Sequence, residues 1–431
     1  MSTDYYYIGF IKLSHFSVKE YLISQYIQNH KVTHIRDFSF NEELSHSVIS
    51  QICLAYLLQF KMSEPLDMTV DVSYPLADYA AKHWILHTHS SGKTRSQSSV
   101  VFALMMKLLT HESAAFLNWV QLCDIDNYYA RHLQRPRDQI AKPLYYASLT
   151  GLTEASNALL EMGADINAKG GKFGNALQAA LYTDHEAIAK LLIEKGADVN
   201  AQGGYYGTAL QAASDAGHEG IMKLLLKKGA DVNAQGGYYG NALQAASDRG
   251  HETIAKLLIE KGADVNAQGG YYGNALQAAS DRGYEAIAKL LIEKGADVNA
   301  QGGYYGNALQ AASDSGHEAI AKLLIEKGAD VNAQGGYYKN ALMAALNAGH
   351  WFIAKLLIEK GADVHEQGYY GNPLYATLNA GHEAIAKQLI EKGADINEHA
   401  QGGRYGHALQ AASSRGYEAV AKLLIRKGRC K

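Results

Sequence analysis

The sequence contains little cysteine, little proline and no long apolar run. Its 431 residues include three cysteines and five prolines, and Cys53, Cys123 and Cys430 show no metal-binding or redox spacing. We therefore expect three free thiols in a reducing compartment. The N-terminus lacks a basic segment followed by an apolar run, so no signal peptide is expected. No apolar run approaches the roughly 18 residues that a membrane span needs. These absences predict an intracellular, cytoplasmic protein without membrane contact.

An excess of charge of either sign is missing as well. Lysine and arginine together number 40 and aspartate and glutamate 43, which gives a formal net charge of −3. A near-neutral chain lacks the basic field that attracts phosphate backbones, so nucleic acid is not an expected partner. Apolar residues make up 47% of the chain, which is typical of a folded protein and argues against disorder.

Glycine and tyrosine, by contrast, are abundant, with 42 and 29 residues, because the chain is repetitive. The sequence Gly-Ala-Asp followed by Val or Ile recurs at intervals of 33 residues, and the last interval is 32 because one glycine before Tyr369 is missing. The markers start at Gly163, Gly196, Gly229, Gly262, Gly295, Gly328, Gly361 and Gly393. Aligned on them, residues 141–431 form about nine units, the last of which is shorter.

The sequence pattern of each unit predicts two helices followed by a loop. In residues 241–273 a short alanine-rich helix ends near Gly250, and a second helix with apolar residues three and four apart ends near Gly262. The remaining Gly- and Asn-rich stretch predicts a turn-forming finger. Because a unit of this size cannot bury its apolar face alone, we expect the units to stack into a solenoid with one continuous core.

The period, the Gly-Ala-Asp-Val-Asn-Ala sequence and the Gly-His turns between the helices resemble ankyrin repeats over about residues 141–431. Where that family usually reads Thr-Pro-Leu-His, these units read Asn-Ala-Leu-Gln, as at Asn241–Gln244. We expect the Asn to cap the first helix in place of Thr, and the Gln to bridge between units. The resemblance implies a non-enzymatic module that binds a protein partner through its fingers and concave face. It implies no cofactor and no small-molecule substrate, and we expect a monomer in isolation.

Residues 1–140 are not repetitive. We expect a β-prone segment at 5–13 and a helix at about 17–27. Further helices are expected after Asn41, which caps the first of them, from Pro75 in the first turn through about Leu86, at 100–109 and at 114–122. In the helix after Asn41, the apolar face is predicted to carry Leu44, Val48, Ile52 and Tyr56.

Two stretches of this region carry a second resemblance. His15–Leu22 and Tyr74–Trp84 are similar to the winged-helix end and helical connector of fungal NACHT-type signalling NTPases. The predicted fold is therefore all-α, with a short β-containing winged-helix remnant and connector in 1–140 and the ankyrin solenoid in 141–431. An alternative function follows from this resemblance: the chain is the sensor arm of a signalling NTPase whose nucleotide-binding domain is missing from it.

Candidate catalytic and ligand-binding groups are weak. Gly92, Lys93 and Thr94 look like the end of a phosphate loop, but the motif needs glycine where His87 stands, so a solvated loop is favoured. His83, His87 and His89 lack a Cys or carboxylate that would complete a metal site, so we expect them at the surface. In the array every candidate group recurs equivalently, whereas an active site needs different residues that converge once. We predict no catalytic, cofactor-binding or metal-binding residue.

The predicted partner-binding residues lie in the fingers and at the ends of the first helices. Two interpretations remain open: both tyrosines of a finger pair are exposed, or one of them packs against the next finger. We expect Ser in place of Tyr239, Tyr272 and Tyr305 to abolish partner binding while leaving helicity and melting largely intact. Trp351 and Phe352 either form a local contact or fill a gap left by the shortened finger. The full set is Tyr205, Tyr206, Tyr238, Tyr239, Tyr271, Tyr272, Tyr304, Tyr305, Tyr337, Tyr338, Asp248, Arg249, Asp281, Arg282, Trp351 and Phe352.

Overall fold

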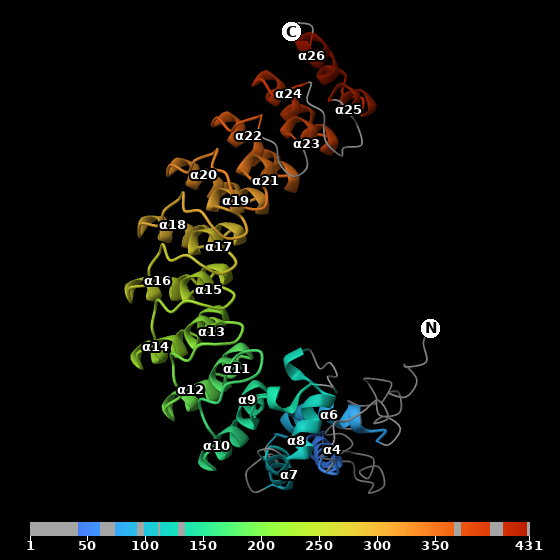
Figure 1. Cartoon of the computed structure of the whole chain (residues 1–431), viewed down its shortest axis with the longest axis vertical. Helices are drawn as coiled ribbons and strands as arrows, with labels where there is room; N and C mark the ends of the chain where they lie inside the picture. The colour runs from blue at the N-terminus through green and yellow to red at the C-terminus, as the bar shows by residue number, and fades with distance from the viewer. Residues whose placement is uncertain are drawn as a thin grey trace, which may run out of the picture. The chain divides into compact units, whose positions relative to one another are not determined.

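The computed structural model describes residues 42–60, 74–92, 99–110, 113–127, 133, 135–365, 372–396 and 408–428. In these ranges the secondary structure is helical apart from isolated β-bridges, so a β-containing winged-helix remnant has no support there. The β-prone segment 5–13 and the helix expected at 17–27 lie outside the described residues. The chain divides into two compact units, Met1–Lys172 and Phe173–Lys431, which are shown in Figure 1. The boundary predicted at 140/141 from the repeat stays a prediction.

The first unit is a helical cluster around large aromatic side chains. The rings of Trp84, Trp119 and Tyr146 are fully buried, with centroids 5.3 Å apart for the tryptophan pair and 5.9 Å apart for Trp119 and Tyr146. The helices expected at 100–109 and 114–122 are confirmed within a residue, and serine side chains cap both. The helices are α4 (Glu42–Leu57), α6 (Ala77–Ser90), α7 (Val100–Leu108), α8 (Ala114–Leu122), α9 (Pro143–Leu149) and α10 (Thr153–Glu161), with short 3-10 turns η3 (Ile125–Asn127) and η4 (Arg137–Gln139).

The apolar face expected for α4 is not the face that the helix buries. Leu44, Val48 and Ile52 are exposed, and α4 buries the face that carries Ser47, Ser50, Cys53, Leu54 and Leu57. The physical reason lies in the partner helix, because the hydroxyls of Ser50 and Thr88 on α6 form a buried hydrogen bond of 2.7 Å. Two hydroxyl groups that hydrogen-bond to each other can be buried at a low free-energy cost. The spacing of apolar residues in the sequence does not indicate such a pair.

The second unit consists of stacked helix pairs, with first helices packed on first helices and second helices on second helices (Figure 1). The first helices are α11 (Ala176–Tyr182), α13 (Ala209–Ala216), α15 (Ala242–Arg249), α17 (Ala275–Arg282), α19 (Ala308–Ser315), α21 (Ala341–Ala348), α23 (Pro373–Ala380) and α25 (Ala408–Ser414). The second helices are α12 (Glu186–Glu194), α14 (Glu219–Lys227), α16 (Glu252–Glu260), α18 (Glu285–Glu293), α20 (Glu318–Glu326), α22 (Trp351–Glu359), α24 (Glu383–Glu391) and α26 (Glu418–Gly428).

The Asn-Ala-Leu-Gln junction has the predicted chemistry. The side chain of Asn241 accepts a hydrogen bond of 2.9 Å from the backbone N–H of Gln244, so Asn caps the first helix. The Gln side chain is fully buried and reaches the next finger: in the junction Asn307–Gln310, Nε2 of Gln310 donates to the carbonyl oxygen of Ala333 at 3.2 Å. Both expectations are confirmed, and the bridging Gln supplies a buried donor to a carbonyl group of the next finger.

The fingers approach one another so closely that their turns require glycine. Gly237 adopts φ +65, and a Cβ added there would lie 2.2 Å from the carbonyl carbon of Tyr206 in the preceding finger. On the far side of each loop, an Asn bridges two repeats: Nδ2 of Asn233 donates to the carbonyl of Gly262 at 3.0 Å, and Oδ1 accepts from the N–H of Asp264 at 2.8 Å. These contacts fix the spacing of the fingers. Within the described ranges no helix has the length and apolar character of a bilayer span.

Candidate protein-binding surface

The structure separates the tyrosine pairs of the fingers into two rows. The first tyrosines of the pairs form an outer row that is partly exposed. Four of them have exposed fractions of 37–46%, and Tyr238 has an intermediate exposure. The second tyrosine forms an inner row that is buried at four positions and half-buried at the fifth. The outer row is Tyr205, Tyr238, Tyr271, Tyr304 and Tyr337, and the inner row is Tyr206, Tyr239, Tyr272, Tyr305 and Tyr338. Tyr369 and Tyr370 lie outside the described residues.

The outer row is a continuous ladder across five fingers. Successive rings stack with centroids 5.2–5.4 Å apart and planes inclined by 13–14°. The backbone reinforces the stack, since each tyrosine N–H donates to the carbonyl of the preceding outer tyrosine, as Tyr238 does to Tyr205 at 2.9 Å. Each outer ring also meets its inner neighbour edge-on, at 5.0 Å for Tyr271 and Tyr272. The row is therefore held in place before any partner arrives, which lowers the entropy cost of binding.

The inner row is tied into a buried network with aspartates at the ends of the first helices. The hydroxyl of Tyr272 donates to Asp248 at 2.5 Å, and Nε of Arg282 in the next repeat donates to the same carboxylate at 2.6 Å. Asp248 is 4% exposed. Burial, the hydrogen bond to Asp248 and the charge of that carboxylate raise the pKa of Tyr272. This phenol consequently stays protonated and acts as a structural donor.

The same network recurs at regular sequence distances along the array. Each aspartate carboxylate accepts a hydrogen bond from the hydroxyl of the inner tyrosine that lies 24 residues later in the sequence. In two repeats it also accepts one from Nε of the arginine that lies 34 residues later. At Asp281 the position of that arginine is taken by Ser315, whose hydroxyl donates to the carboxylate at 2.7 Å. The aspartate–tyrosine pairs are Asp215–Tyr239, Asp248–Tyr272, Asp281–Tyr305 and Asp314–Tyr338.

This geometry decides between the two interpretations of the tyrosine pairs. In four of the five fingers only the outer tyrosine is partly exposed and the inner one is buried between fingers; in the fifth, Tyr338 is half-buried. The burial of Tyr239, Tyr272 and Tyr305, at 1–8% exposure, contradicts the expectation that serine at these positions leaves melting unchanged. Asp248 and Asp281 are likewise mostly covered by their tyrosine and arginine or serine partners, with side-chain exposures of 3% and 10%. The spacing of 24 residues between aspartate and inner tyrosine was visible in the sequence and could have revealed the network.

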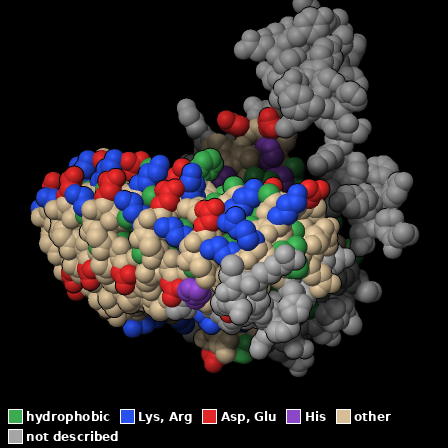
Figure 2. Space-filling view, turned by 90° about the horizontal axis from the view of Figure 1, so that it is seen from above, with side chains coloured by type: hydrophobic (Ala, Val, Ile, Leu, Met, Phe, Trp, Pro, Cys, Tyr) green, Lys and Arg blue, Asp and Glu red, His purple; other side chains and the backbone are tan. Residues whose placement is uncertain are grey.

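The arginines of this network remain accessible. The side chains of Arg249 and Arg282 are 50% and 48% exposed, although Nε of each is bound to a covered aspartate. The Asp215 hydrogen bond raises the pKa of Arg249, so the guanidinium stays charged. Elsewhere on the visible surface, basic and acidic side chains are interspersed rather than gathered by sign (Figure 2). On the second helices many are paired, as in the ion pairs between Lys223 and Glu219 and between Lys387 and Glu383.

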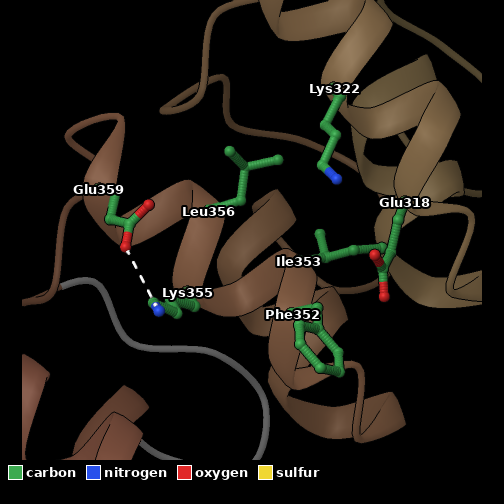
Figure 3. A pocket seen from close by; sticks show the side chains of 7 residues that line it. All are labelled: Glu318, Lys322, Phe352, Ile353, Lys355, Leu356 and Glu359. Carbon is green, nitrogen blue, oxygen red and sulfur yellow. Dashed lines mark ion pairs between the residues drawn. The ribbon is translucent and has the colours of Figure 1, made fainter.

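Trp351 and Phe352 play different parts. Trp351 stacks on the ring of His382 in the next repeat, with centroids 3.3 Å apart, which agrees with a packing role. Phe352 is 75% exposed, so it fills no gap. It borders a shallow pocket of about 170 Å³ between α20 and α22, with Leu356 and Lys322 among the other lining residues (Figure 3).

The histidines near the end of α6 are not all at the surface. His87 is buried, its Nδ1 lies 2.7 Å from Nδ1 of His46, and its Nε2 lies 3.0 Å from the hydroxyl of Tyr79. Burial, followed by the charges of His46 and His83, lowers the pKa of His87 to about 4. Among the described residues no group of three or more His, Cys, Asp or Glu could hold a metal ion. Lys93 and Thr94 lie outside the described residues.

Comparison with known families identifies the class. The family described as ankyrin repeats (three copies) matches in overlapping windows that together run over residues 108–431. The chain belongs to the ankyrin-repeat family. Proteins of this family are generally interaction modules without catalytic activity, and the match indicates protein partners and no catalytic family.

One curated relative is the azaphilone pigments biosynthesis cluster protein L of Monascus ruber. It is 36% identical over 192 residues, which cover 42% of this chain and 39% of the relative. The aligned region is thus well under two thirds of the relative's length. Neither finding supports the resemblance of His15–Leu22 and Tyr74–Trp84 to NACHT-type signalling NTPases, which stays a hypothesis.

Proposed function

We propose that the protein is a recognition module that binds a protein partner along the outer tyrosine row, with Arg249 and Arg282 at its side. The observation that carries this proposal is the ladder itself: five tyrosines, stacked and hydrogen-bonded through the backbone, keep their edges exposed. Tyrosine and arginine are the residues that dominate binding energy at protein interfaces. Because the stacked tyrosines are already ordered, they lose little conformational entropy when a partner binds.

The test compares two triple variants of the full chain as bait in extracts of the native cells. The first, Tyr238→Ser with Tyr271→Ser and Tyr304→Ser, removes the centre of the outer row. The matched control places one substitution in each of three repeats on exposed second-helix lysines, Lys256→Ser, Lys289→Ser and Lys322→Ser.

We expect the wild-type chain and the lysine variant to retain the same proteins, identified by mass spectrometry, and the tyrosine variant to lose them. Circular dichroism at several temperatures must show that all three baits are folded. If the folded tyrosine variant retains the same proteins in the same amounts, the outer row is not the binding surface.

A further inference from the structure

The outer row leaves only certain parts of its rings available. Each ring face is covered by the next ring along the ladder, at 5.2–5.4 Å and nearly parallel, so only the end rings of Tyr205 and Tyr337 have a face without an outer-row neighbour among the described residues. Nucleobases, sugars and proline rings bind aromatic side chains through their faces. What the row presents to solvent is ring edges and hydroxyl groups. Ring edges carry partial positive charge and favour electron-rich acceptors.

Four of the outer hydroxyls are unused donors within the described part of the chain. Among the described residues, the hydroxyls of Tyr205, Tyr238, Tyr271 and Tyr304 make no hydrogen bond, whereas the buried inner hydroxyls bind aspartates. Partial burial raises the pKa of Tyr205, Tyr238 and Tyr271, so these phenols hold their protons at neutral pH. The row therefore offers a line of hydrogen-bond donors that needs a line of acceptors.

The most exposed charged side chains of the aspartate–tyrosine network are its two arginines, whereas its four aspartates, Asp215, Asp248, Asp281 and Asp314, are buried or half-buried. Arg249 and Arg282 are half exposed while their aspartate partners, Asp215 and Asp248, are 10% and 3% exposed at the side chain. The guanidinium groups therefore cover the carboxylates and present positive charge to solvent. Arginine in this arrangement recognises carboxylates through its remaining N–H groups.

Lys339 adds a third cation in the finger of Tyr337. It is exposed, has φ 72, and stands where the four preceding fingers have glycine. The backbone of Lys339 is held in this left-handed region by the turn, because its carbonyl oxygen accepts a hydrogen bond of 2.8 Å from the N–H of Gly335. Its side chain makes no ion pair with the described residues, so the ammonium group is available to an anionic ligand.

We infer that this edge binds an acidic polypeptide segment in an extended conformation, with the outer tyrosine hydroxyls donating to its carbonyl and carboxylate oxygens and Arg249, Arg282 and Lys339 pairing with its acidic side chains. The four ring-to-ring steps amount to about 21 Å, which an extended segment of about six residues spans at about 3.3 Å per residue. This inference rests on the proposed function and names the chemistry of its partner.

The first experiment selects ligands from a displayed library of random hexapeptides between Gly-Ser flanks, using the full chain. We expect Asp and Glu to be enriched at least about threefold over the unselected library, because each adds a charge-assisted hydrogen bond. Selected peptides that are basic, apolar or proline-rich without acidic residues would overturn the inference, as would a selection that enriches no sequence.

The second experiment measures the affinity of the most enriched acidic peptide by fluorescence anisotropy for variants of the cations. Arg249→Ser with Arg282→Ser should bind at least about tenfold more weakly, the effect of losing charged hydrogen bonds. Serine is chosen because the array itself carries Ser315 opposite Asp281, where the hydroxyl satisfies the carboxylate. Lys339→Gly, which restores the glycine of the other fingers, should also weaken binding.

The reverse substitution gives a gain of affinity. Ser315→Arg places a third arginine in the series of Arg249 and Arg282, and we expect it to bind the same peptide about threefold or more tightly. Unchanged affinity in both the double serine variant and Ser315→Arg, with unchanged melting, would overturn the acidic partner.

The hydroxyl donors are tested with Tyr238→Phe, Tyr271→Phe and Tyr304→Phe together, which keep the rings and should bind about tenfold more weakly. Equal affinity of this variant and the wild type would refute the hydroxyl contribution. If the serine triple in the outer row abolishes partner retention while the phenylalanine triple and the arginine variants bind normally, the proposed function stands and the acidic, hydrogen-bonded partner does not. Competition by a single-stranded oligonucleotide at equal affinity would also overturn the inference in favour of a general polyanion site.

Discussion

The two tyrosines of one finger provide a within-pair test of the structure. Tyr272 is 1% exposed and its hydroxyl binds Asp248, whereas its neighbour Tyr271 is 37% exposed and stacks between two outer rings. Tyr272→Ser removes a buried ring, and truncation of a buried aromatic side chain costs about 3–5 kcal/mol. Tyr271→Ser loses two stacking contacts in a half-solvated setting, which we place at about 1–2 kcal/mol.

Tyr272→Phe separates the hydroxyl from the ring. The ring stays packed, but the carboxylate of Asp248 loses one of its two donors while remaining buried with Arg282. Loss of a hydrogen bond to a buried charged group costs about 1–3 kcal/mol. The loss in free energy of unfolding should therefore be largest for Tyr272→Ser and smaller for Tyr272→Phe. The loss for Tyr271→Ser should be similar to or smaller than that for Tyr272→Phe.

The assay is urea unfolding of the full chain, followed by far-ultraviolet circular dichroism. Hydrogen exchange should be measured as well, because a repeat array can unfold in parts. In exchange, the loss of protection for Tyr272→Ser should centre on α15, α17 and the finger between them. Equal destabilisation by Tyr271→Ser and Tyr272→Ser, or a Tyr272→Phe variant as stable as the wild type, would refute the assignment of outer and inner rows.

Two further predictions concern other parts of the chain. The pKa of His87 is lowered to about 4, so the folded unit holds it neutral while the unfolded chain binds a proton below about pH 6.5. The free energy of unfolding should therefore fall as pH drops from about 6.5 to 4, by at most about 3 kcal/mol. In melting curves at pH 7.5, 6 and 5, His87→Gln should show a weaker dependence of stability on pH. An equally steep dependence in the variant would show that other groups cause it. In α22, Trp351→Ser should lower the melting temperature because the stacking of Trp351 on His382 is lost. Phe352→Ser, at a side chain that is 75% exposed, should change the free energy of unfolding by less than about 0.5 kcal/mol. A large loss of stability in Phe352→Ser would mean that the Phe352 ring packs against the fold.

Features that depend on local chemistry or on the repeat period could be predicted from the sequence. The 33-residue period, the glycines that end the helices and the capping Asn241 are properties of a few neighbouring residues, and the structure confirms all three. Prediction failed on α4, where apolar spacing favoured Leu44, Val48 and Ile52 as the buried face. The partner helix reverses that preference through the hydroxyl pair of Ser50 and Thr88, which only the tertiary contact brings together.

The proposed binding surface illustrates why a repeated motif alone does not identify which of two adjacent tyrosines is exposed. In the sequence, the two tyrosines of each finger are adjacent and chemically identical, so composition gives no reason to rank them. The difference arises because the two tyrosines occupy successive positions of a turn, with their rings edge-on to each other, and only the second one reaches the carboxylate row formed by Asp215, Asp248 and Asp281. The tyrosine that meets a carboxylate becomes a packing residue, whereas Tyr205, Tyr238, Tyr271 and Tyr304 keep hydroxyls without a partner in the described part of the chain. Exposure of the outer row is thus a consequence of satisfying the inner row. On the proposed function, a substitution of the aspartates should therefore weaken partner binding indirectly, through the spacing of the fingers.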